Sequence, residues 1–152
     1  MWIMTSFIHM AKRYTTQLEH DQVVLASADT YNNYRDKGYI ISANLTGKEC
    51  HDIGQGIYPD LVVWRTGGEY GRTLIIEEVE TAESINFREA KQWKKYANLN
   101  YTFYLIVPED YITQTQEILD KENIKVDLLE YYYFDEEDRI RFSTRNDIPL
   151  VG

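Results

Sequence analysis

Residues 72–80, with the sequence RTLIIEEVE, begin as an apolar strand and end in three glutamates. Leucine and isoleucine favour a buried β-strand, and a carboxylate buried there needs a charged or hydrogen-bonding partner. The preceding run, residues 60–65 (DLVVWR), is also rich in strand formers and starts with Asp60. The glycine-containing segment 66–71 separates the two runs. This order predicts a β-hairpin with a turn longer than two residues.

The segments around the hairpin predict an α/β domain. The other expected strands cover residues 39–45, 100–107, 124–134 and 139–142. Helices are expected over residues 1–15, over residues 16–36, after Asn86 and after Pro108. Asn86 and Glu89 have the spacing of a helix capping box. Strand–helix–strand order near the end of the chain requires parallel pairing, whereas the hairpin is antiparallel. We therefore expect a mixed central β-sheet with helices on both faces.

A length of 152 residues fits one domain. We expect residues 1–15 to extend it as an N-terminal helix and residues 143–152 to form a loose tail. No apolar run is long enough to cross a bilayer. Cys50 is the only cysteine, so no internal disulfide can form, and we expect a cytoplasmic protein. The net charge of −9 argues against a protein that coats nucleic acid through bulk charge. It does not exclude a nucleic-acid enzyme, because an acidic protein can carry a basic strip on one face.

The carboxylates of the hairpin are the candidate chemical groups. Side chains alternate along a strand, so Glu78 and Glu80 point to the same face, and Glu77 points to the other. In an antiparallel pair, the start of one strand lies beside the end of the next, which brings Asp60 to Glu78 and Glu80. Like charges crowded together repel unless a cation lies between them. Hard oxygen ligands favour Mg²⁺ or Mn²⁺, so we predict a divalent metal site.

These residues resemble the PD-(D/E)XK nuclease superfamily. Its bipartite motif is similar to Ile57-Tyr-Pro-Asp60 followed by Glu78-Val-Glu80, and the Q-x-x-x-Y motif of its RecB-type members is similar to Gln92-Trp-Lys-Lys-Tyr96. The resemblance implies a restriction-endonuclease-like fold and a nuclease that hydrolyses DNA. It also implies that Asp60, Glu78 and the main-chain carbonyl of Val79 hold the metal. It further implies accessory roles for Glu19 and Tyr96, and Lys91 is a third candidate accessory residue.

The main departure from the motif is Glu80, which stands where the family has lysine. One interpretation keeps an active site, in which Glu80 acts as metal ligand or general base and Gln92 helps to orient the attacking water. Lys91, Lys94 or Lys95 could then supply the missing positive charge, and helical periodicity favours Lys91 and Lys95. The other interpretation is a catalytically degenerate nuclease fold that serves binding or assembly in a viral, mobile-element or defence system.

The remaining sequence features are weaker. His20 lies beside Glu19 and could line the same site, although a histidine on a helix surface is the commoner case. Cys50 and His51 are adjacent, but no second cysteine or spaced histidine completes a metal site. A domain of this size has little room for a separate recognition module. We therefore expect it to work as a homodimer or with a protein partner.

Overall fold

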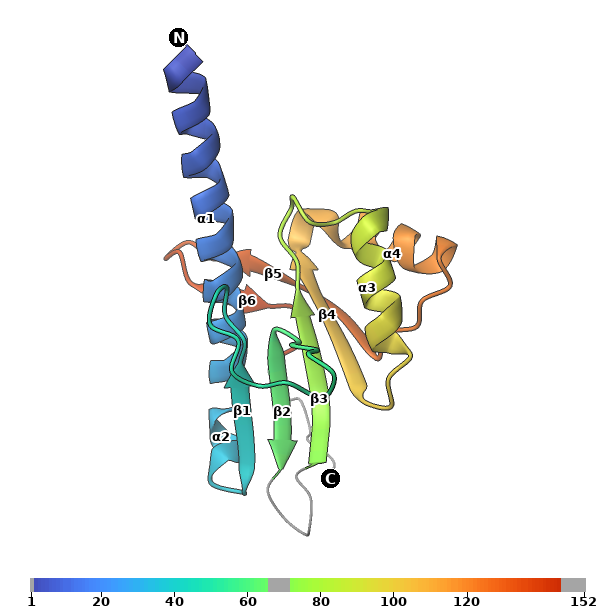
Figure 1. The fold of residues 1–152 in the computed structure, drawn as a ribbon. Helices are drawn as coiled ribbons and strands as arrows, with labels where there is room; N and C mark the ends of the chain where they lie inside the picture. Colours follow the sequence, from blue (N-terminus) through green and yellow to red (C-terminus); the bar gives the residue numbers. More distant parts are fainter. Residues whose placement is uncertain (1, 66–71, 146–152) are drawn as a thin grey trace.

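The computed structural model describes the backbone of residues 2–65 and 72–145 and the side chains of residues 16–65 and 72–145. Within these residues it has one strongly curled six-stranded sheet and four α-helices (Figure 1). The expected turn at 66–71 and the end of the expected tail, 146–152, lie outside the described residues. No helix in the described part of the chain is both long and apolar enough to cross a bilayer.

The strands pair in the order in which they occur along the chain. They are β1 (Tyr39–Ala43), β2 (Leu61–Arg65), β3 (Arg72–Val79), β4 (Thr102–Pro108), β5 (Leu128–Phe134) and β6 (Ile140–Phe142). β2 runs antiparallel to both of its neighbours, β1 and β3. β3, β4 and β5 are parallel, and β6 returns antiparallel to β5. The mixed sheet and the β2–β3 hairpin predicted from the sequence are therefore confirmed.

The helices differ from the prediction at the N-terminus. They are α1 (Trp2–Asp29), α2 (Asn32–Arg35), α3 (Phe87–Ala97) and α4 (Ile112–Lys121), the last preceded by a 3₁₀ turn at Glu109–Tyr111. Residues 1–15 and 16–36 were expected as two helical runs, and this division is wrong. No glycine or proline interrupts residues 2–29, so one helix runs through them. The predicted cap of α3 is confirmed, because the Asn86 side chain accepts a hydrogen bond from the Glu89 backbone N–H.

Two apolar cores lie on opposite faces of the sheet. One packs α1 and Tyr31 against β1, β2 and alternate residues of β3, such as Ile75 and Val79. The other packs α3 and α4 against β4 and against Ile76 of β3. Both faces are therefore covered by helices, as the sequence predicted. The alternation along β3 sends Glu77 toward α1 and sends Glu78 and Glu80 toward α3.

Two polar side chains shape the loop between β1 and β2, residues 44–60. Asn44 is buried, accepts hydrogen bonds from the backbone N–H groups of Cys50 and His51, and donates to the carbonyl of Pro59. Asp52 accepts hydrogen bonds from the backbone N–H groups of Gly54, Gly56 and Ile57. These bonds replace the regular pairing that a loop lacks. They fix the segment that delivers Asp60 to the start of β2.

The loose tail was predicted to begin at residue 143, but residues 143–145 are held against the domain. Ser143 is joined to β5 by hydrogen bonds with the backbone of Tyr131. The Arg145 guanidinium is buried and forms ion pairs with Glu77 on β3 and Glu130 on β5. Residues 143–145 are therefore part of the packed domain. This long-range ion pairing has no local sequence signal.

Candidate functional site

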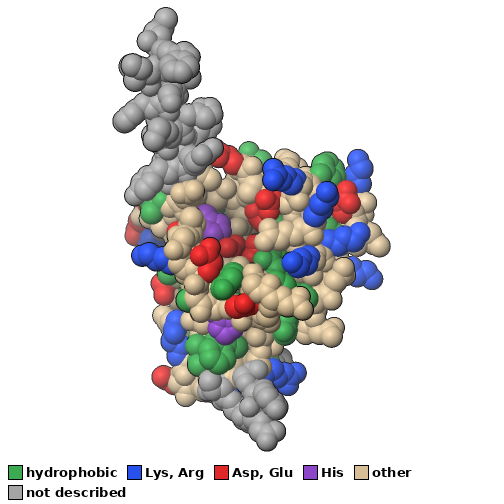
Figure 2. Space-filling model, in the orientation of Figure 1, with side chains coloured by type: hydrophobic (Ala, Val, Ile, Leu, Met, Phe, Trp, Pro, Cys, Tyr) green, Lys and Arg blue, Asp and Glu red, His purple; other side chains and the backbone are tan. Residues whose placement is uncertain are grey.

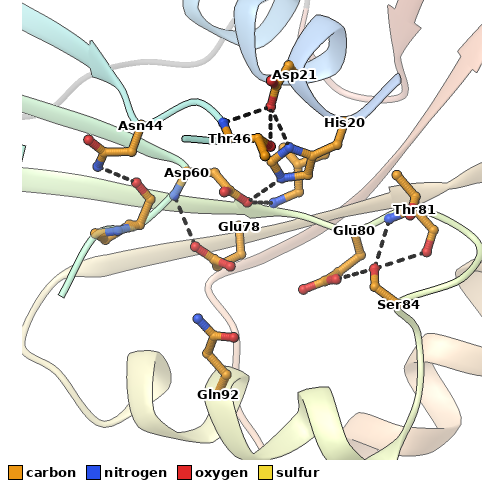
Figure 3. Close-up of polar contacts among 12 residues, drawn as sticks. His20, Asp21, Asn44, Thr46, Asp60, Glu78, Glu80, Thr81, Ser84 and Gln92 are labelled. Atoms are coloured by element: carbon orange, nitrogen blue, oxygen red, sulfur yellow. Dashed lines mark hydrogen bonds and ion pairs between the residues drawn. The ribbon is translucent and has the colours of Figure 1, made fainter. Parts of the chain in front are cut away.

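Asp60 and Glu78 lie side by side on neighbouring strands. The backbone N–H of Asp60 donates to Glu78 Oε1 at 3.0 Å, and the backbone N–H of Val79 donates to Asp60 Oδ2 at 2.8 Å. Both bonds follow from the hairpin register, in which Leu61 is opposite Glu77 (Figure 3). The structure thus brings together two of the three carboxylates that the sequence placed at this rim.

Glu78 has unusual surroundings for a carboxyl group. Its side chain is only 6% exposed, and burial together with the charges of Asp60 and Glu80 raises its pKa well above the usual range. The preceding residue, Glu77, is buried on the other face but accepts hydrogen bonds from Ser27 and Tyr31 and pairs with Arg145. β3 therefore carries two buried carboxyl groups with different surroundings. Glu77 has the Arg145 cation beside it, whereas Glu78 faces the carboxylates of Asp60 and Glu80. A carboxylate with surroundings like those of Glu78 favours an added cation.

His20 on α1 completes this group. Its Nε2 lies 3.1 Å from Asp60 Oδ2, and its Nδ1 lies 2.9 Å from Asp21 Oδ1. Asp21 in turn accepts hydrogen bonds from the backbone and the hydroxyl of Thr46, so α1 is tied to the β1–β2 loop. Burial alone lowers the pKa of His20, but the hydrogen bond and charge of Asp60, with those of Asp21, outweigh it and raise the pKa to about 9.

Glu19, which the sequence named as an accessory, lies elsewhere. Its carboxylate accepts a hydrogen bond of 2.9 Å from the Tyr132 hydroxyl on β5. Consecutive helical residues point about 100° apart, so only one of Glu19 and His20 can face Asp60. Packing of α1 through Val23 and Val24 sets that choice. The sequence indicated that Glu19 and His20 lie next to each other on this helix, but it did not indicate which of the two faces Asp60.

Glu80 is held apart from the other two carboxylates. The indole Nε1 of Trp93 donates to its Oε1 at 2.8 Å. The Ser84 hydroxyl donates to its Oε2 (Figure 3). Burial raises the pKa of Glu80 to about 7, although the two hydrogen bonds oppose this effect. A carboxyl group with a pKa near 7 can exchange a proton at neutral pH. Glu80 nevertheless lines the same small hollow as Asp60, Glu78 and His20.

The α3 helix forms the facing wall of a cleft of about 900 Å³ above Asp60. Lys91, Gln92, Lys95 and Tyr96 line it from α3, and the Gln92 amide donates to the Tyr96 hydroxyl at 3.0 Å. The predicted sharing of one helix side by Gln92, Lys91 and Lys95 is confirmed, and Lys94 is not among the lining residues. In Figure 2, acidic and histidine side chains gather in the hollow of this face, and basic side chains gather beside it over α3 and α4.

The donor set suits a hard divalent ion held mainly by water and substrate. Among the described residues, no group of three or more His, Cys, Asp or Glu side chains is arranged to hold a metal ion. Mg²⁺, however, is commonly bound through one or two carboxylates and keeps several waters. Asp60 and Glu78 provide two such carboxylates, and no basic side chain in the described part of the chain forms an ion pair with Glu78. The residues present therefore fit Mg²⁺ or Mn²⁺, with Val79 placed next to them by its hydrogen bond to Asp60.

Comparison with protein-family models, curated proteins and solved structures finds no match to this chain. The resemblance to PD-(D/E)XK nucleases therefore stays a prediction from the motif residues.

The ion pair between His20 and Asp60 predicts a pH-dependent stability. Because the pKa of His20 is raised from 6.5 to about 9, the stabilisation is complete below pH 6.5 and is lost as pH rises through about 9. We expect this loss to be on the order of 2–3 kcal/mol in the unfolding free energy. Urea unfolding in EDTA at pH 6 and pH 9.5 measures it, with His20→Asn as the comparison. Equal pH dependence in the two proteins would contradict a charged His20.

Proposed function

We propose that this protein is a metal-dependent nuclease that hydrolyses phosphodiester bonds of DNA. The observation that carries the proposal is the pairing of a half-buried Asp60 with a buried Glu78. Glu78 faces like charges, while Glu77 beside it is paired with Arg145. Such an arrangement is costly without a cation. A restriction-endonuclease-like assignment of the sheet belongs to the same proposal and is supported by the hairpin that carries both residues.

Each residue of the site has a role that its position suggests. Asp60 and Glu78 would hold Mg²⁺ or Mn²⁺, with the Val79 carbonyl as a further ligand. The ion would polarise a phosphate oxygen and lower the pKa of an attacking water. Glu80, whose pKa is about 7, would accept a proton from that water. Gln92 lines both the small hollow and the cleft and would orient the water or the phosphate.

The facing wall of the cleft supports a polyanionic substrate. The α3 helix carries four basic residues, Arg88, Lys91, Lys94 and Lys95, in a chain whose net charge is −9. Lys91 and Lys95 line the cleft that also contains Asp60. A local concentration of positive charge is the usual means of holding the phosphate backbone. The two lysines would take the place of the motif lysine that Glu80 replaces.

A specific observation favours a second candidate, a nuclease fold that binds without cleaving. Both oxygens of Glu80 are engaged, by Trp93 and by Ser84, and neither partner is a cation. A site in which Glu80 serves only to anchor α3 would lack a proton acceptor. This candidate predicts nucleic-acid binding without turnover, so one assay separates the two.

The test is cleavage of single-stranded, branched and plasmid DNA in Mg²⁺, Mn²⁺ or EDTA. We expect cleavage with either metal and none in EDTA. Asp60→Asn should slow it by at least about 100-fold, because a bound metal contributes several kcal/mol to such a reaction. The asparagine oxygen can still accept the hydrogen bond from the Val79 N–H, so the variant should keep its fold.

Asp36→Asn is the matched control for this test. Asp36 is exposed at the end of α2 and lines neither the hollow nor the cleft, so we expect the parent rate. Cleavage that Asp60→Asn leaves unchanged would assign the activity to a contaminant. Binding without cleavage under every condition would select the second candidate.

A further inference from the structure

We propose that a pocket at the far end of β2, formed by Trp64, His51, Tyr101 and Arg72, binds an unpaired base of a nucleic-acid strand. The proposal rests on the proposed function, because it identifies a single-stranded or locally unpaired nucleic acid as the substrate of the Asp60 cleft. It goes beyond the nuclease motif, since the motif includes none of these four residues.

The pocket is built around an aromatic pair. The rings of Trp64 and His51 have their centroids 5.0 Å apart and are tilted by 41°. Trp64 is only half-buried, whereas Trp93 is completely buried in the α3 core. The indole Nε1 of Trp64 donates to the Ser42 hydroxyl at 3.0 Å, which fixes the orientation of the ring. A ring fixed in this way loses little freedom when a base stacks on it.

Aromatic and polar groups lie around this pair. Tyr101 and Asn100, which follow α3, line the same pocket of about 640 Å³. This volume falls within the usual range for small-ligand sites. Arg72 also lines it, is exposed, and makes no ion pair with any described residue. Burial lowers the pKa of His51, so its ring is neutral at pH 7 and can stack as an uncharged aromatic.

The pocket continues the face that carries the cleft. Asp60 immediately precedes β2 and Trp64 lies four residues along the chain, which corresponds to about 13 Å at the usual strand rise. The β1–β2 loop contributes residues to both sites, Thr46 and Tyr58 to the cleft and His51 to the pocket. A strand whose phosphate lies at Asp60 could therefore reach Trp64 within a few nucleotides.

The chemistry favours an unpaired base. In a duplex the faces of the bases are covered by their neighbours, so only base edges and phosphates are accessible. Stacking on aromatic rings requires an exposed base face, and it tolerates any sequence. A guanidinium beside the rings adds attraction for the phosphate or the base.

The experiment measures the affinity of the full chain for a fluorescent 12-nucleotide oligothymidylate and for a duplex of equal length. EDTA removes the metal, so no cleavage occurs during the measurement. The ionic strength is fixed, so that the salt-dependent contribution of phosphate contacts to the affinity is the same in every sample. We expect Trp64→Ala to weaken single-strand binding about 10- to 100-fold, the range of one stacking interaction. Duplex affinity should change by less than about threefold, since phosphate contacts are unaffected.

Four further variants separate the loss of stacking from a loss of folding. Trp64→Phe retains an aromatic ring and should restore most of the affinity. His51→Ala changes a residue of the β1–β2 loop and leaves β2 unaltered, and it should weaken single-strand binding severalfold. Ser42→Ala removes the Trp64 hydrogen bond but leaves the ring, so it should weaken single-strand binding less than Trp64→Ala does. Tyr133→Ala removes an exposed aromatic ring on β5 and should have no effect.

Parental single-strand affinity in both Trp64→Ala and His51→Ala would overturn the pocket, as would equal losses for single strand and duplex. Failure of the parent chain to bind the single strand would also overturn it. These outcomes are independent of the nuclease proposal. Absence of cleavage together with Trp64-dependent binding would reject the nuclease and keep the pocket. Metal-dependent cleavage together with single-strand affinity that Trp64→Ala leaves unchanged would support the nuclease proposal and reject the pocket proposal.

Discussion

Glu78→Gln is expected to slow metal-dependent cleavage about 1,000-fold and, at the same time, to stabilise the metal-free protein at pH 8. The rate falls because the amide cannot replace a carboxylate metal ligand, and metal stabilisation is worth several kcal/mol. The stability rises because the folded parent must either protonate Glu78 or bury its charge beside Asp60 and Glu80. Glutamine retains an acceptor for the Asp60 N–H and removes the repulsion.

The sign of the pH dependence follows from the raised pKa of Glu78. An acid whose pKa is higher in the folded state stabilises the protein below its unfolded value of 4.5, and that stabilisation is lost as pH rises through the folded value. The advantage of Glu78→Gln should therefore be large at pH 8 and small at pH 4. Urea unfolding in EDTA at both pH values measures it. Adding Mg²⁺ should stabilise the parent more than the variant.

Glu89→Gln makes the same chemical change at a half-exposed carboxylate on α3 that also lines the hollow. We expect only small changes in rate and in the urea midpoint. A Glu78→Gln protein that cleaves at the parental rate would remove Glu78 from the site. A stability gain that is equal at pH 4 and pH 8 would show that charge burial is not its cause.

The sequence predicted the sheet well because each strand carries a local signal. The apolar runs that became β2 and β3 place Asp60 and Glu78 in register once the hairpin closes, so this part of the site could be predicted. The boundaries of the N-terminal helix could not. α1 ends at Asp29, and just beyond it the hydroxyl of Tyr31 donates to the buried Glu77, a contact that spans 46 residues of the chain. Local patterns do not encode such a contact.

The remaining site residues show which information the sequence lacked. Alternation along β3 correctly placed Glu80 on the same face as Glu78, but Trp93 of α3 holds its carboxyl group apart. His20 reaches Asp60 because of how α1 packs on the sheet, which no periodicity in the helix specifies. No local pattern indicates that Trp64 lies half-buried beside His51, as it does in the structure. Tertiary packing decides each of these positions.

The second large effect is expected on the other face of β3. Replacing Arg145 by methionine should lower the unfolding free energy by about 3–5 kcal/mol, the usual cost of removing one partner from a buried ion pair. The guanidinium lies 3.1 Å from Glu77 Oε1 and 2.5 Å from Glu130 Oε1, and all three side chains are at most 4% exposed. Methionine fills similar space but leaves two carboxylates buried without their cation. Urea unfolding at pH 7 measures the change.

Two comparisons identify the cause of that loss. Arg141→Met changes an exposed arginine that pairs with Asp135 at the surface, and its urea midpoint should stay close to that of the parent. Adding Glu77→Gln to Arg145→Met should recover part of the loss, because the amide removes one of the unpaired charges while it can still accept from Ser27 and Tyr31. A parental midpoint for Arg145→Met would mean that the guanidinium does not hold these strands together. A double variant no more stable than Arg145→Met alone would indicate that the unpaired charge of Glu77 is not the main cause of the loss. The lost packing of the guanidinium against Tyr31 and Phe142 would then explain it.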